Sequence, residues 1–282
     1  MPPTSAPPAS ASANSAPTSP SGSQDGRTGA LSWIIGGSTL TQLRAADTAG
    51  NLTKQFFDTP RAYVITNPKD WSVPDGWTST PTASFTSYAA LQAAVSSGKL
   101  DPRIRAVLYD NESWSQTPVA EQRDPAHYDQ LAAQLVHQHH LLFIATPAVD
   151  LTKSAGAQDR YSRFLASGLV GSIAGDADVI DIQAQGSEMD VAKYEAFVSA
   201  AAAQARRSNP GVKVLAGIST NPTGQAVTTQ DVVKAIGSVQ GTVDGYWLND
   251  PARSAYCPTC AGPFPQVSLG ILSALAVSGK SG

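Results

Sequence analysis

The chain has 282 residues, of which 41% are hydrophobic and 15% charged, and its formal net charge is −3. This length and apolar content suffice for one large domain with a full core. The net charge is weakly acidic, so the sequence lacks the excess of basic residues typical of a nucleic-acid-binding protein. It also contains no run of about 18 apolar residues, which a membrane-spanning helix would need. We expect a monomeric protein that has no membrane span and does not bind nucleic acid.

The first segment, residues 1–29, differs in composition from the rest of the chain. Met1 to Gln24 contain no charged residue and consist almost entirely of Pro, Ser, Ala, Thr, Gly and Asn. Such a segment buries too little apolar surface to offset its ordering entropy, so we predict a disordered tether before a domain at 30–282. Tethers of this kind are common in exported bacterial proteins. We therefore expect an extracellular or cell-surface protein whose leader is absent from this sequence; a cytosolic protein with a disordered N-terminus is the alternative.

Apolar runs and helical periodicity alternate through the remainder of the chain. Strands are predicted at 32–37, 62–66, 83–85, 106–112, 141–146, 179–185, 212–218 and 244–248. Helices are predicted at 40–57, 88–97, 124–137, 157–174, 191–207, 229–239 and 267–277, and 67–81 is predicted as a long loop. Eight strands alternating with helices over about 250 residues predict an α/β fold, a single (β/α)₈ TIM barrel. A doubly wound sheet is the alternative, but Gly36-Gly37-Ser38 is too short for its phosphate-binding turn.

The two cysteines, Cys257 and Cys260, follow the last predicted strand as Cys-Pro-Thr-Cys. Gly262, Pro263 and Pro265 come next and predict a loop rather than the helix N-terminus that a redox-active pair needs. Zinc would require two further ligands. We favour a disulfide that staples this loop, in agreement with export; two reduced thiols are the alternative.

If the fold is a barrel, its site lies at the carboxyl ends of the strands. Polar or large residues at those predicted ends are Asn67, Asp110, Glu112, Thr146, Asp150, Asp181, Gln183, Gln185, Ser219, Asn221, Trp247, Asn249 and Asp250. The run 106–112 is the most informative, because strand alternation puts Leu108, Asp110 and Glu112 on one face. Acids seldom face inward unless they are paired or used, so Asp110 and Glu112 are candidate catalytic groups, with ion pairs to Arg103 or Arg105 as the structural alternative.

The other residues at these ends indicate the kind of ligand. Asp181 is a third candidate catalytic acid and shares one strand face with two glutamines. Amides and carboxylates bind hydroxyl groups, and an indole packs on the C–H face of a sugar. We therefore expect a carbohydrate ligand and no cofactor. The candidate substrate-binding residues are Asn67, Trp114, Gln183, Gln185, Asn221, Tyr246 and Trp247.

With these features in order, the chain resembles the chitinase-like glycoside hydrolases of family 18 in a divergent form, and also uncharacterised barrel proteins of actinobacteria. That family carries Asp-x-Asp-x-Glu on its fourth strand, where this chain has Leu108-Tyr109-Asp110-Asn111-Glu112. Its eighth strand ends in Gly-x-Trp, matched by Gly245-Tyr246-Trp247. The family's earlier acids fall on Arg105 and Leu108, and its sixth-strand Tyr is missing, with Gln185 nearest.

The resemblance implies an acid/base mechanism. Glu112 would protonate the glycosidic oxygen and then activate water, while Asp110 orients an N-acetyl group or raises the pKa of Glu112. One alternative is a non-catalytic barrel that binds glycan through its tryptophans: Trp71, Trp77, Trp114 and Trp247. Another is a hydrolase or lyase in which Asp110, Glu112 and Asp181 hold Mg²⁺ or Ca²⁺.

Two further groups receive structural interpretations. His137, His139 and His140 fall at a predicted helix end on the opposite face of the barrel, so we do not expect a metal site there. Glu188 and Asp190 are predicted to cap the helix that begins near Val191.

Overall fold

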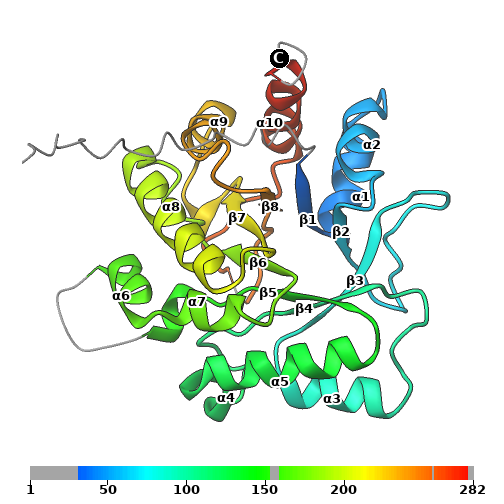
Figure 1. Cartoon of the computed structure of the whole chain (residues 1–282). Helices are drawn as coiled ribbons and strands as arrows, with labels where there is room; N and C mark the ends of the chain where they lie inside the picture. Colours follow the sequence, from blue (N-terminus) through cyan, green and yellow to red (C-terminus); the bar gives the residue numbers. More distant parts are fainter. Residues whose placement is uncertain (1–30, 153–158, 256, 279–282) are drawn as a thin grey trace, which may run out of the picture.

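The computed structural model describes residues 31–152, 159–255 and 257–278, and its centre is a closed barrel of eight parallel strands (Figure 1). Each strand pairs with its neighbour in chain order, and β8 closes the sheet by pairing with β1. The strands are β1 (Ser32–Gly36), β2 (Ala62–Ile65), β3 (Thr80–Phe85), β4 (Ala106–Tyr109), β5 (Leu142–Ala145), β6 (Val179–Ile182), β7 (Lys213–Ser219) and β8 (Gly245–Asn249). The predicted (β/α)₈ barrel is confirmed. The predicted tether at 1–29 lies outside the described residues.

Helices surround the barrel and, except between β2 and β3, return the chain from the carboxyl end of one strand to the start of the next (Figure 1). They are α1 (Gly37–Ala46), α2 (Asn51–Phe57), α3 (Tyr88–Ser96), α4 (Val119–Arg123), α5 (Pro125–Gln138), α6 (Arg160–Ser167), α7 (Leu169–Ala174), α8 (Val191–Ser208), α9 (Thr229–Ser238) and α10 (Pro265–Ser278), with two short 3₁₀ helices, η1 (Val149–Thr152) and η2 (Pro222–Gly224). None of these helices is both long and apolar enough to cross a bilayer.

The strands are apolar on both faces because each face is buried. One set of side chains fills the barrel, among them Ile34, Tyr63, Leu108, Ile144 and Leu215. The alternate set, which includes Trp33, Val107 and Phe143, packs against the helices. Strands covered on both sides read as continuous apolar runs, which is why the sequence locates them well.

Two predicted helices are each divided in the structure. The helix predicted at 40–57 breaks into α1 and α2, where Gly50 takes a left-handed conformation and Asp47 accepts hydrogen bonds from the amide and hydroxyl of Thr53. The helix predicted at 157–174 breaks at Gly168, which also has a positive φ. Apolar periodicity continues through both breaks, so only the glycine conformation reveals them.

No helix connects β2 to β3, as the predicted loop at 67–81 anticipates. The segment crosses the outside of the barrel, and its two tryptophans pack on the core where a helix would otherwise lie. The Arg103 guanidinium lies 3.6 Å from the centre of the Trp71 ring, and that of Arg44 lies 5.4 Å from the centre of the Trp77 ring. At Gly37, where α1 begins, a Cβ would collide with Ser72 of this segment, so the close crossing requires glycine.

Candidate active site

A cavity of about 480 Å³ opens over the carboxyl ends of β4, β6 and β8. Its volume lies within the usual range for small-molecule sites. Three groups of residues line it: Asp110, Glu112 and Trp114 after β4; Gln183 and Gln185 after β6; and Trp247, Asn249, Pro251, Ala252, Ser254 and Cys257 in β8 and the loop that follows it. Both acids and two indoles therefore share one cavity.

The two acids reach this cavity because the alternation of β4 continues past its last residue, Tyr109. The strand was predicted to run to Glu112, and the amide of Asp110 still donates to the Phe85 carbonyl at 2.8 Å, which extends the pairing with β3. Asn111, between the acids, points the opposite way and is fully buried behind the sheet. There the Tyr109 hydroxyl donates to Glu121 at 2.6 Å, which fixes the outward face of the strand.

One amide group connects the two carboxylates. Gln183 Nε2 lies 3.2 Å from Asp110 Oδ1, 3.4 Å from Glu112 Oε1 and 2.8 Å from the Thr146 carbonyl oxygen. The Thr146 hydroxyl donates a second hydrogen bond to Asp110 Oδ1 at 2.9 Å. Asp110 and Glu112 are therefore close neighbours, held by neutral donors from β5 and β6.

The two neighbouring acids have different pKa values. Burial raises the pKa of Asp110 to about 6, against the lowering effect of the hydrogen bonds from Thr146 and Gln183. Burial, followed by the negative charges of Asp110 and Asp150, raises the pKa of Glu112 to about 8. At pH 7 Glu112 is mostly protonated and Asp110 mostly ionised, the pairing of states that acid/base chemistry needs.

The structural alternative for these acids, ion pairs with arginine, is not what the structure shows. Arg103 pairs with Asp101 at 2.8 Å, and the Arg105 guanidinium donates to the carbonyls of Pro102 and Ile104. Both arginines precede β4 and lie at the opposite end of the strand from the acids. Neither guanidinium donates to Asp110 or Glu112.

The loop after β4 is fixed by a small polar network. The Trp114 indole N–H donates to the Thr117 hydroxyl at 2.8 Å, and that hydroxyl donates to the Thr86 carbonyl. Gln122 donates to the carbonyls of both Trp114 and Thr117 at 2.7 Å. Asp150 accepts from the Ser113 amide at 3.0 Å, so η1 is tied to the same loop.

Asp181 lies in the barrel interior below the cavity. It is fully buried, and neither carboxylate oxygen has a hydrogen-bond partner among the described residues. Burial, then the charge of Asp110, raises the pKa of Asp181 well above its usual range. Asp181 does not line the cavity, so it is not placed to contact a ligand as the predicted third catalytic acid would. It can act only indirectly, through its electrostatic interaction with Asp110.

Three predicted substrate-binding residues lie outside the cavity. Tyr246 faces the helical layer, where its hydroxyl donates to the Ile236 carbonyl at 3.2 Å, because its neighbour Trp247 takes the inner face of β8. Asn67 is exposed, and its Oδ1 accepts from the amides of Lys69 and Asp70 in a tight turn. Asn221 is buried and serves the loop described next. These three assignments are therefore corrected, whereas Trp114, Gln183, Gln185 and Trp247 do line the cavity.

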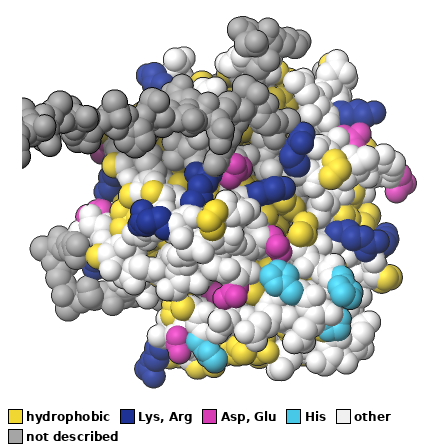
Figure 2. Space-filling view, viewed as in Figure 1, with side chains coloured by type: hydrophobic (Ala, Val, Ile, Leu, Met, Phe, Trp, Pro, Cys, Tyr) yellow, Lys and Arg dark blue, Asp and Glu magenta, His cyan; other side chains and the backbone are white. Residues whose placement is uncertain are grey.

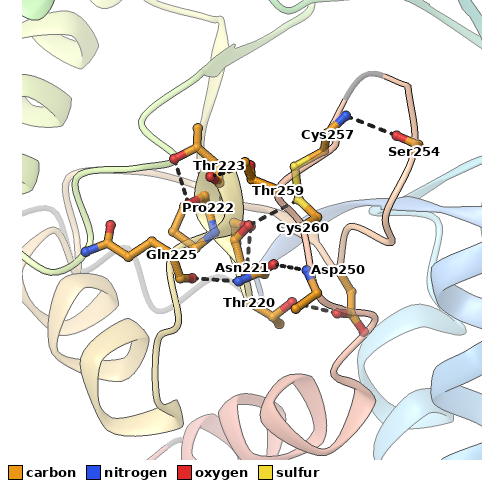
Figure 3. The surroundings of a disulfide bond; sticks show 12 residues. Thr220, Asn221, Pro222, Thr223, Gln225, Asp250, Ser254, Cys257, Thr259 and Cys260 are labelled. Carbon is orange, nitrogen blue, oxygen red and sulfur yellow. Dashed lines mark hydrogen bonds between the residues drawn. A yellow bond between two sulfur atoms is a disulfide. The ribbon is translucent and has the colours of Figure 1, made fainter.

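The loop between β8 and α10 forms one wall of the cavity, and sequence reasoning did not assign it a role. Cys257 and Cys260 form a disulfide in it, as we favoured (Figure 3). Asn221 Oδ1 accepts from the Ala261 amide at 2.8 Å, which ties the loop to η2. Asp250 Oδ1 accepts from the Thr220 hydroxyl and the Phe264 amide, both at 2.6 Å. The loop follows a barrel strand, and loops in that position form the active site of such barrels, so the sequence could have predicted that it lines the cavity.

On β7, a glycine makes room for one cavity side chain. A Cβ at Gly217 would collide with the Gln185 carboxamide, so Gln185 lies directly across the backbone of β7. Glu188 was predicted to cap α8, but it is buried and accepts from the amides of Ser219 and Gly186 at 2.9 and 2.6 Å. Asp190 alone caps the helix, through the Lys193 amide.

The histidines lie away from this cavity. His139 and His140 line a second cavity of about 520 Å³ that also contains Asp101 and Arg105, beside the chain segments that enter β4 and β5. Several histidines lie near one another at the lower right of the face shown in Figure 2. His137 Nε2 is 2.9 Å from Asp178 Oδ2. Within the described ranges, no group of three or more His, Cys, Asp or Glu side chains could hold a metal ion.

Comparisons with known proteins give distant similarity only. No protein-family model and no curated protein matches the sequence. Among the solved structures that it matches are three with 9–13% identity. They are a provisionally assigned alpha-L-fucosidase from Bacteroides thetaiotaomicron (9%, 65% of this chain and 59% of that one, TM-score 0.42), a triosephosphate isomerase from Bartonella henselae (13%, 78% and 92%, 0.44) and a GH10 endoxylanase from a sugarcane soil metagenome (12%, 71% and 64%, 0.46).

This chain therefore spans less than two thirds of the fucosidase and xylanase chains. With every one of these TM-scores below 0.5, we base no inference on the similarity. None of these comparisons indicates membership of glycoside hydrolase family 18, which stays a resemblance in sequence pattern.

Proposed function

We propose that the protein is a glycoside hydrolase that acts on an oligosaccharide or a cell-wall glycan, with Glu112 as general acid and then general base. One observation carries the proposal. A partly buried carboxyl whose pKa is about 8 adjoins a carboxylate whose pKa is about 6, in a cavity that also contains two indoles. When two neighbouring titratable groups have different pKa values because of their surroundings, the group with the higher pKa can serve as the acid and the other as the charged partner.

The geometry supports the following sequence of steps. The Glu112 carboxyl donates its proton to the glycosidic oxygen as the C–O bond breaks, and the resulting carboxylate then takes a proton from the attacking water. Asp110, held by Thr146 and Gln183, faces the positive charge that develops on the sugar or orients a neighbouring acetamide. No acid stands at the end of β7, where the chain reads Ser219-Thr220-Asn221, so Asp110 is the partner of Glu112.

The tryptophans separate this proposal from a purely binding barrel. Trp114 and Trp247 line the cavity with the acids, where an indole can pack on a sugar ring. Trp71 and Trp77, which the binding alternative also needs, lie on the outside of the barrel under Arg103 and Arg44. The aromatic surface is therefore concentrated where the titrating groups are.

Export to an extracellular or cell-surface location stays part of the proposal. The disulfide supports it, because structural disulfides persist mainly in oxidising compartments. We also propose that the ligand is a carbohydrate, that no resident cofactor is needed and that the protein is a monomer.

The test is Glu112→Gln. The amide has the shape and the neutral charge of the protonated carboxyl, so we expect an unchanged circular-dichroism spectrum and retained glycan affinity. Turnover of a glycan that the wild type cleaves should fall by about 10²- to 10⁴-fold. A glycan panel with mass spectrometry of the products identifies that substrate first.

The matched control is Glu195→Gln, which makes the same change on the exposed side of α8 and should leave turnover unaltered. A wild type that binds glycans and never cleaves them would establish the binding barrel instead. Full activity in Glu112→Gln would show that another group is the acid.

A further inference from the structure

The cavity contains acids and no basic residue. Among the described residues, no lysine, arginine or histidine lines it. The four ion pairs that the structure shows in the described ranges use Asp101, Asp159, Asp178 and Asp244, and none uses an acid of the site. The hydrogen-bond partners of Asp110, Glu112 and Asp150 are neutral hydroxyl and amide groups.

A deeper acid adds to this imbalance. Asp181 is fully buried on β6, on the face that carries Gln183 into the cavity, and both of its oxygens are unpartnered among the described residues. Burial and mutual repulsion make it costly to ionise several carboxyl groups in one place without a nearby cation. A ligand that brings positive charge would relieve both costs.

We infer, on the basis of the proposed glycosidase function, that the cavity selects glycans built from 2-amino sugars with free, protonated amines over neutral glycans, and rejects acidic glycans. An ammonium group would act as the missing counter-ion of Asp110, in a partly desolvated site where attraction between charges is stronger than in water. A uronate or sulfate group would meet the same carboxylates with repulsion.

The other residues that line the cavity favour a sugar that bears the positive charge over a small free cation. Trp114 and Trp247 supply flat apolar walls, and Gln183, Gln185 and Asn249 supply donors and acceptors for hydroxyl groups. A small alkylamine or a bare metal cation would leave these walls and amides unused. The pKa of Glu112, raised partly by Asp110 and Asp150, agrees with negative charge that no cation balances.

The experiment measures binding to Glu112→Gln, whose turnover should be too slow to deplete its ligands, by calorimetry at pH 6.5 and low salt. Glucosamine tetramer and cellotetraose share a β-1,4 backbone and differ only in an amine or a hydroxyl at C2, so they form a matched pair. We expect the amino sugar to bind at least about tenfold more tightly, and this advantage to shrink in high salt because ions screen it. Tetragalacturonate should show no binding.

Two variants in the Glu112→Gln background locate the effect. Adding Asp110→Asn should remove most of the amine advantage, whereas adding Glu195→Gln, an equal charge change on the surface of α8, should leave it intact. Equal affinities for the matched pair, tighter binding of tetragalacturonate, or binding of none of the three would overturn the inference. Cleavage of a neutral glycan by the wild type would leave the proposed function standing, whereas an amine preference without any cleavage would refute the function alone.

Discussion

At the scale of single residues, Gln183 is the group that connects the candidate catalytic acids. It cannot titrate, and its Nε2 lies within 3.4 Å of an oxygen of both carboxyls. A donated hydrogen bond favours the ionised form, so Gln183 lowers the pKa of Asp110 and of Glu112 while burial raises both. The negative charges of Asp110 and Asp150 raise the pKa of Glu112 further, so the two acids are in different protonation states near neutral pH.

The pH dependence of activity follows from these two groups. Below about pH 6 Asp110 gains a proton and its stabilising charge is lost, and above about pH 8 Glu112 loses the proton that it donates. We expect a bell-shaped profile of kcat/KM with its plateau between these values, measured on a soluble substrate. An optimum near pH 4 to 5 would contradict the assignment.

Substituting Gln183 tests its role separately. In Gln183→Leu the hydrogen bonds to both carboxyls are lost, so both limbs of the pH profile should move to higher pH. Gln230→Leu, the same change on the exposed side of α9, should leave the profile in place. A fall in activity without movement of either limb would indicate that Gln183 is only structural.

At the scale of elements, the loop between β8 and α10 shapes the cavity more than any helix. It contributes Pro251, Ala252, Ser254 and Cys257 to the lining, and the disulfide together with Asn221 and Asp250 holds it to the end of β7 (Figure 3). The acids lie on the other side of the cavity, after β4. The wall formed by this loop and the two acids therefore belong to different segments of the chain.

Removing the disulfide should therefore affect binding before chemistry. For Cys257→Ser with Cys260→Ser we expect KM to rise several-fold with kcat little changed, because the wall loosens while Glu112 and Asp110 stay in place. The disulfide closes a loop of only a few residues, so the loss of stability should be about 2 kcal/mol or less by denaturant unfolding. A selective fall in kcat would mean that the loop positions the acids.

At the scale of the whole molecule, the buried acids and the surface acids respond to pH in opposite ways. Burial raises the pKa values of Asp129, Asp181 and Glu188 as well as those of the catalytic pair. On the surface, hydrogen bonds from Arg103 lower the pKa of Asp101 to about 2. The native state therefore holds more protons than the unfolded chain above pH 4, and stability falls as pH rises there.

We expect the melting temperature to be highest near pH 4 to 5 and to decline toward pH 8, with a loss of stability on the order of several kcal/mol over that range. Asp181→Asn should flatten the decline, because the amide cannot ionise in either state. The exposed change Asp75→Asn should leave the slope unaltered. A melting temperature that rises from pH 5 to pH 8 would contradict this sign.

By itself, the sequence determined the barrel and its acidic centre. Runs such as Ala106–Tyr109 are apolar on both faces because both faces are buried, and Asp110 and Glu112 share a face because strand alternation is local geometry. The disulfide was predictable too, because the flanking glycine and prolines exclude a helix. These features depend on residues that are neighbours in the chain.

Tertiary structure alone decided which strand ends meet. Asn67, Asn221 and Tyr246 satisfied the same sequence pattern as Gln183, yet each bonds to its own surroundings, whereas Gln183 reaches Asp110 from more than 70 positions away. Tertiary structure also decided three other features of the site. These are the cavity wall from the last loop, the burial that raises the pKa of Glu112 and the lack of a neighbouring cation among the described residues. Desolvation and charge proximity depend on distances in space, which the order of residues along the chain does not contain.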